Sequence, residues 1–170
     1  MDYFERHFAL IKKSEKIFKQ HKMDPQIEIA GLPDIEEVYE KTGQDLLNKD
    51  IIEQFLSMRS VPHYKIVVKK LIDFTLSEWI TCLNEKVLLE YSIPVLYKAL
   101  SHYPMLYGTN DEWQVLFEIT KVEESFWKTY RGLKKPFVAI IDKVLYENAK
   151  ENFYSSIKQE YLESMKDFVK

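Results

Sequence analysis

Apolar residues recur every three or four positions along most of the chain, which is the spacing of one face of an α-helix. The four glycines and six prolines fall between these periodic segments, where they interrupt helices. Glycine this scarce argues against an architecture rich in β-hairpins. The pattern predicts helices over residues 2–21, 34–43, 45–58, 62–84, 86–102, 110–131 and 136–168. We therefore expect an all-α fold, one domain over residues 1–170 in which six or seven helices form a bundle.

The most apolar segment is 62–84. One stripe at helical spacing contains Val68, Leu76 and Trp79, and only a narrow strip between Lys70 and Asn84 is polar. A helix that is apolar around most of its circumference is contacted on several sides by other helices. We expect 62–84 to be one central helix around which the bundle packs.

The ends of the other helices follow from local signals. Asp34 and Glu37 have the spacing of a capping box, and Gly43 suits the position that ends a helix. Thr109 or Asn110 is expected to cap the helix 110–131. In the first helix the apolar residues share one face, at positions Phe4, Phe8, Ile11 and Phe18.

Two helices contain a point at which the pattern allows two outcomes. Pro94 marks either a kink within 86–102 or a fresh start after Ser92. Pro136 suits the first turn of a long C-terminal helix that runs to about residue 168. The polar stretch 146–152 is where this helix either wraps around the bundle or breaks.

Charge and composition narrow the choice of partner. The net charge is −3, so no strong positive field favours nucleic acid. Only three of the 24 basic residues are arginine, the usual donor of bidentate contacts to guanine and phosphate, which weighs against sequence-specific recognition. The single cysteine, Cys82, excludes an intramolecular disulfide, and no apolar run is long enough to span a membrane. The N-terminal segment lacks the apolar core of a signal peptide. We expect a cytoplasmic protein that does not enter membranes.

No catalytic or metal-binding motif is present. Glycine-rich phosphate loops and the nucleophile-elbow and zinc-protease motifs are absent, and the SxxK match at Ser155 and Lys158 lacks its companion motifs. The four histidines are dispersed along the chain, at positions 7, 21, 63 and 102. The sequence therefore predicts no catalytic residue, no metal site and no cofactor. Cys82 is expected to be a small buried residue.

Two stretches are candidates for a partner-binding surface. The joint between two helices, residues 103–113, is unusually apolar for a connector, so its side chains either fold back over the bundle or form an exposed patch. Folding back is the favoured alternative. A cluster of acids opens the segment 34–43. The candidate partner-binding residues are Tyr103, Met105, Tyr107, Asp111 and Glu112 in the joint, and Glu36, Glu37 and Glu40 in the acidic segment.

The sequence favours a non-enzymatic protein-binding module of the cytoplasm, such as an adaptor, a regulator or an immunity-type inhibitor. Its partner would be another protein of unknown identity, and a second alternative is that the chain forms a homo-oligomer. One alternative is a small helical enzyme whose site is assembled from dispersed residues in a pocket. A third is nucleic-acid binding through the first helix, which carries Lys12, Lys13, Lys16, Lys19 and Lys22. That binding would weaken steeply with salt.

Overall fold

The computed structural model describes residues 2–151 and 157–170, and every regular element among them is helical. The α-helices are α1 (Tyr3–His21), α2 (Gly43–Leu46), α3 (Lys49–Ser57), α4 (Val61–Val68), α5 (Leu76–Glu85), α6 (Leu89–His102), α7 (Gln114–Thr120), α8 (Glu124–Thr129), α9 (Lys134–Glu151) and α10 (Gln159–Phe168). Two short 3-10 turns are η1 (Ile35–Glu37) and η2 (Leu71–Asp73). The predicted all-α class is confirmed, although the described residues form more helices than the six or seven expected.

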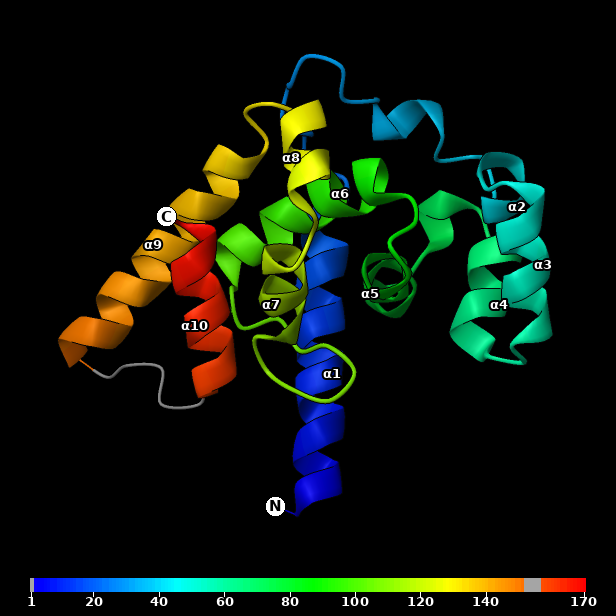
Figure 1. Ribbon diagram of the computed structural model, residues 1–170. Coiled ribbons are helices and arrows are strands. Elements are labelled where there is room, and N and C mark those ends of the chain that lie inside the picture. Colours follow the sequence, from blue (N-terminus) through cyan, green and yellow to red (C-terminus); the bar gives the residue numbers. More distant parts are fainter. Residues whose placement is uncertain (1, 152–156) are drawn as a thin grey trace.

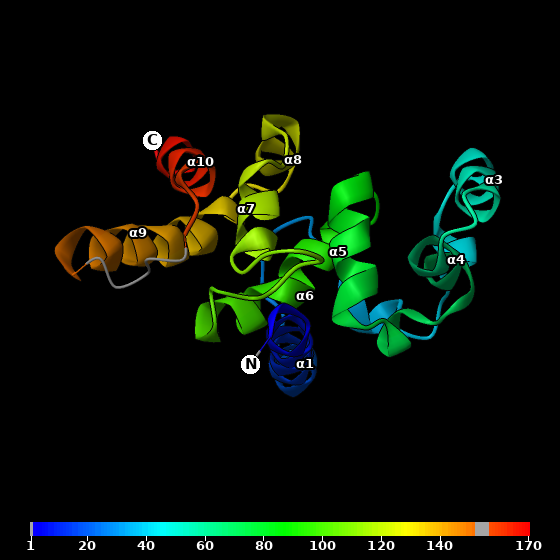
Figure 2. The same ribbon diagram turned by 90° about the horizontal axis from the view of Figure 1, so that it is seen from below.

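The helices are arranged around α5 and α6 (Figure 1). α1 packs against both of them, and α2 to α4 form a small group at one end. α9 and α10 lie at the other end, and α8 lies near the middle (Figures 1 and 2). The buried apolar side chains form one contiguous core, with large members on several elements, such as Phe18, Trp79, Trp113 and Phe137. None of the described helices combines the length and the apolar composition that a membrane crossing requires.

The prediction of one continuous central helix over residues 62–84 is wrong. The chain leaves the helix at Lys69 and re-enters it at Leu76, so α4, η2 and α5 replace one helix. Thr75 and Glu78 form a capping box that starts α5, and the backbone N–H of Leu71 donates to the carbonyl of Lys41. These bonds satisfy backbone groups that a continuous helix would have paired internally. α5 alone is buried on most sides, as the pattern predicted for the whole segment.

A buried ion pair fixes the start of α5. The side chain of Glu78 is 3% exposed, and its carboxylate accepts hydrogen bonds from Lys69 Nζ, at 2.5 Å, and from the hydroxyl of Thr75. Burial by itself would raise the pKa of Glu78, but the hydrogen bonds from Lys69 and Thr75 outweigh it and lower that pKa. The break in the predicted helix is therefore held by a charged group that the core encloses.

The segment 34–58 also differs from its prediction. The helix expected over 34–43 is only the turn η1, because the chain from Tyr39 to Thr42 pairs with residues 70–72 instead. Gly43 does not end a helix but begins α2, where a Cβ atom would lie 2.0 Å from the carbonyl oxygen of Ile66. The predicted helix 45–58 is split between α2 and α3, with Asn48 capping α3.

The helix predicted over 110–131 begins later and is broken in two. Trp113 has a φ of 71°, a left-handed conformation, so the helix begins at Gln114 and neither Thr109 nor Asn110 caps it. The side-chain oxygen of Gln114 instead accepts hydrogen bonds from the backbone N–H groups of both residues, at 2.9 and 3.0 Å. α7 ends at Thr120 and α8 begins at Glu124.

The two open outcomes are resolved as far as the structure describes them. Pro94 lies inside α6, which continues without a fresh start after Ser92. Pro136 lies in the first turn of α9, as predicted. The stretch 146–151 is helical within α9, whereas residue 152 lies outside the described residues. Because Ile157 and Lys158 are not helical, α10 is a separate helix, and it packs against α7 and α9.

Candidate functional site

The N-terminal half of α1 carries exposed apolar side chains and extends beyond the other helices (Figure 1). The side chains of Phe4 and Phe8 are 69% and 59% exposed, and Ile11 is 36% exposed. These residues follow each other at intervals of four and three, so they lie on one side of the helix. We call them the α1 face. Of the four apolar residues that the sequence places on one face of this helix, only Phe18 is buried.

This half of the helix is stabilised locally. The carboxylate of Asp2 accepts a hydrogen bond from the backbone N–H of Glu5 at 2.8 Å, and the side chain of Glu5 accepts one from the backbone N–H of Asp2 at 3.3 Å. A reciprocal pair of this kind satisfies two N–H groups that the first turn would otherwise leave unpaired. The α1 face is therefore presented on a helix whose first turn is capped.

The joint 103–113 folds back against α1. The backbone N–H of Tyr107 donates to the hydroxyl of the buried Ser14 at 2.8 Å, and Leu106 is fully buried. The hydroxyl of Tyr107 lies 2.6 Å from His7 Nδ1 and donates to the carbonyl of Asn110 at 2.5 Å. That hydroxyl then accepts from Nδ1–H of His7. The joint therefore folds back over the bundle, which is the alternative that the sequence favoured over an exposed patch.

Ion pairs surround a cavity of about 220 Å³ between α1 and the joint. Arg6 reaches Glu112 at 3.4 Å, and Asp111 accepts hydrogen bonds from Lys158 at 2.7 Å and from the hydroxyl of Tyr161 at 3.0 Å. Burial and the bond to Asp111 raise the pKa of Tyr161, so this hydroxyl stays protonated and acts as a donor. Cations and anions are matched here, and the arrangement holds α1, the joint and the start of α10 together.

The structure places the predicted partner-binding residues in two separate regions. Tyr107, Asp111 and Glu112 contact α1 or α10, whereas Tyr103 and Met105 are half-buried beside them. The ring of Tyr103 lies under the amine of Lys13, with 4.6 Å between Nζ and the ring centroid. The acidic residues belong to the segment that follows the other end of α1 (Figure 1). They are exposed, and they are Glu36, Glu37 and Glu40.

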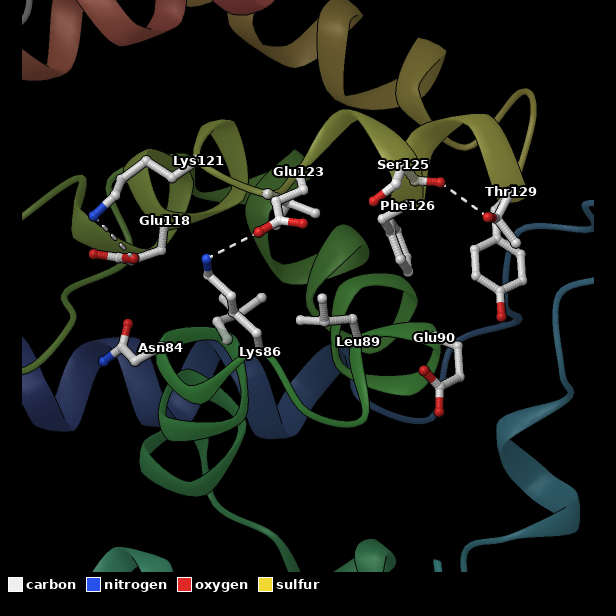
Figure 3. A pocket seen from close by; sticks show the side chains of 13 residues that line it. Asn84, Lys86, Leu89, Glu90, Glu118, Lys121, Glu123, Ser125, Phe126 and Thr129 are labelled. Atoms are coloured by element: carbon white, nitrogen blue, oxygen red, sulfur yellow. Dashed lines mark hydrogen bonds and ion pairs between the residues drawn. The ribbon is translucent and has the colours of Figure 1, made fainter. Parts of the chain in front are cut away.

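A larger groove of about 550 Å³ lies between α5 and α6 on one side and α7 and α8 on the other (Figure 3). Leu89 and Phe126 form apolar parts of its wall. Two ion pairs line it, Lys86 with Glu123 at 3.2 Å and Glu118 with Lys121 at 3.7 Å. The sequence did not predict this groove, because its walls come from four helices and form only when these helices pack together.

Burial changes the titration of Tyr130, one of the residues that line this groove. Burial first, and then the negative charge of Glu90, raise the pKa of Tyr130 above its usual range. A tyrosine whose pKa moves further from neutrality is a poorer acid and base at physiological pH.

One group of dispersed residues has the side chains needed to hold a metal ion. His21, at the end of α1, and His102, at the end of α6, have stacked rings whose centroids are 4.0 Å apart. Asp24 lies beside them, and one ligand atom from each of the three residues lies within 4.8 Å of the others. Sequence spacing could not reveal this group, because packing of α1 against α6 brings the histidines together.

Comparison with protein-family models, with curated proteins and with solved structures finds no match to this chain.

Proposed function

We propose that this chain is a protein-binding module and that the α1 face inserts into an apolar groove of its partner. The observation that carries the proposal is the exposure of Phe4, Phe8 and Ile11 on one side of a capped helix. Amphipathic helices that bind in grooves use anchors at positions i, i+4 and i+7, which is the spacing found here. Because the aromatic side chains of Phe4 and Phe8 are exposed to solvent, they do not contribute to the hydrophobic core of this chain.

The partner groove should be apolar with an acidic rim. Lys12 and Lys16 are exposed and follow Phe8 at intervals of four, so they run along the flank of the α1 face. Acidic groups on the partner would complement them and would speed association at low salt. An adaptor, a regulator or an inhibitor would all use such a surface.

The joint has a supporting place in this proposal. Tyr107 contacts His7 and Glu112 pairs with Arg6, so these two residues of the joint fix the position of α1 relative to the body of the protein. A direct partner contact by the joint, or by Glu36, Glu37 and Glu40, remains part of the proposal. So does the cytoplasmic location, for which the single buried cysteine is the supporting observation.

Phe8→Ala tests the proposal. Burying a whole Phe side chain contributes roughly 1.5–3 kcal/mol, and Phe8 has 59% of its surface still to bury. The substitution should therefore weaken binding by about 1–2 kcal/mol, or roughly 5- to 30-fold in Kd. Tyr146→Ala is the matched control, because Tyr146 is an aromatic residue that is 66% exposed on α9. Both variants should keep the wild-type melting temperature, since neither residue is buried.

The partner is identified by a photoreactive amino acid at position 8 in native cells, with position 146 as control. A single protein cross-linked from position 8 alone, followed by a titration of the purified pair, would support the proposal. If Phe8→Ala and Tyr146→Ala bind that protein equally well, the α1 face is not the interface. Cross-linking that disappears after nuclease treatment would point to nucleic acid at the lysines of α1, and a cross-link between two copies would point to a homo-oligomer.

A further inference from the structure

We propose that His21, Asp24 and His102 form a binding site for a divalent transition-metal ion. α1 packs against α6, which places the last residue of each helix side by side. The carboxylate oxygen Oδ2 of Asp24 lies 2.9 Å from Nδ1 of His21, and the two imidazole rings are nearly parallel, at 10°. One ligand atom from each of two helix ends and a turn thus lies within 4.8 Å of the other two.

The donor set defines the class of ion. Two imidazole nitrogens and one carboxylate oxygen suit Zn²⁺, Co²⁺ or Ni²⁺, whereas Ca²⁺ and Mg²⁺ require a shell made of oxygen. Three protein ligands leave a fourth position for water or for a group of another molecule. The site therefore has the composition of an open zinc-type centre.

The electrostatic surroundings also favour a cation. His21 ends α1 and His102 ends α6, so the negative ends of two helix dipoles point toward the site. Two lysines that line the same hollow, Lys22 and Lys98, oppose this effect; Lys22 Nζ donates to the carbonyl of Ile72 at 2.9 Å, and Lys98 Nζ lies 5.8 Å from the ring centroid of Tyr97.

Binding requires a small rearrangement of the stack. Ligands held at about 2.0–2.1 Å in a tetrahedron lie about 3.4 Å from one another, so the three ligand atoms must approach more closely. The imidazole lone pair lies in the plane of the ring, and the two rings must therefore turn their edges toward the ion. His102 is exposed at the last position of α6, and its ring can turn without disturbing the core.

The ion would connect the C-terminal ends of α1 and α6. Because α1 carries the exposed face on its other half, metal binding would stiffen the base of that helix. The site itself does not depend on the proposed partner, since all three ligands belong to this chain.

The test is a titration of the full chain, first treated with a chelator, with ZnCl₂ in a calorimeter and with CoCl₂ by visible absorbance. We expect one ion per chain, a Co²⁺ spectrum typical of nitrogen and oxygen ligands, and a rise in melting temperature with Zn²⁺ but not with Ca²⁺. His102→Ala and Asp24→Asn should each weaken binding by more than about tenfold. His7→Ala is the control, because His7 is the other histidine of α1 and lies outside the site.

The result that overturns the proposal is equally direct. The titration reaches about 100 µM Zn²⁺, which is enough to detect binding with a Kd between the micromolar and the millimolar range. If the wild-type protein then shows neither heat of binding nor a rise in melting temperature, it has no such site. Binding that survives in both His102→Ala and Asp24→Asn would assign the ion to scattered surface groups. If one variant unfolds, the other still decides, because circular dichroism reports the fold of each before the titration.

Discussion

Replacing Lys69 by methionine removes the cation that faces the buried carboxylate of Glu78. The Glu78 side chain is 3% exposed and that of Lys69 is 25% exposed, so water compensates the lost charge poorly. Methionine keeps the length and the apolar stem of lysine, and the substitution therefore tests the charge rather than the packing. We expect a large loss of stability from this single change.

The magnitude follows from the partners that remain. Removing one member of a buried ion pair costs about 3–5 kcal/mol, because the other charge stays in the interior. The hydroxyl and the backbone N–H of Thr75 still donate to Glu78 in the variant and offset part of that cost. We therefore expect the free energy of unfolding to fall by about 2–3 kcal/mol, which lowers the melting temperature of a domain of this size by roughly 5–10 °C.

Urea unfolding followed by circular dichroism measures this loss, with Lys70→Met as the control. Lys70 is the next residue and also pairs with a glutamate, Glu40, at 2.8 Å. Its side chain and that of Glu40 are 53% and 72% exposed, so water replaces the lost pair and stability should change little. Equal losses in the two variants would refute the argument from burial.

The pH dependence gives a second check. The lowered pKa of Glu78 in the folded protein means that this group stabilises the fold above its ordinary pKa and loses that contribution as the pH falls. In Lys69→Met the support for the charged form is reduced, and burial favours the protonated carboxyl. The deficit of the variant relative to wild type should therefore shrink as the pH falls through about 4. A deficit that stays constant between neutral and acidic pH would contradict the assignment.

Three further changes test other parts of the structure. Gly43→Ala should lower the free energy of unfolding by about 3 kcal/mol, because the new Cβ would lie 2.0 Å from the carbonyl oxygen of Ile66; wild-type urea stability would refute that close approach. Tyr107→Ala should cost about 3 kcal/mol and the half-buried Tyr103→Ala clearly less, and the reverse order in thermal melts would contradict the folded-back joint. The thiol of Cys82 should resist iodoacetamide in the native protein and react in urea, since burial raises its pKa; rapid native alkylation, detected by mass spectrometry, would disprove its enclosure.

Helical periodicity predicts which segments form helices, but it does not predict where each helix ends. α1 matches its prediction within a residue, because one long amphipathic pattern is bounded by clear connectors. In 62–84 the apolar stripe continues through the break, and it concealed the capping signal of Thr75 and Glu78, which is present in the sequence. The hydrogen bonds that end α4 come from a segment some thirty residues earlier, so local pattern had no means of indicating them.

The candidate sites show a similar limit. Periodicity places Phe4, Phe8 and Ile11 on one side of α1, but it does not say whether other helices cover that side. The apolar composition of the joint distinguishes it from an ordinary connector in the sequence. Its contacts with His7 and Ser14 depend on tertiary packing, which the sequence pattern does not show. His21 and His102 lie far apart in the chain, and only the pairing of α1 with α6 makes them neighbours.

The position of α1 has a consequence for synthesis on the ribosome. This helix is synthesised before the surfaces that it packs against, which belong to α5, α6 and the joint. Until residue 107 has left the exit tunnel, Phe18 has no completed core to enter and Ser14 has no backbone donor. The nascent chain therefore exposes both sides of α1 at once, and during this interval it is a natural client for chaperones that hold apolar helices.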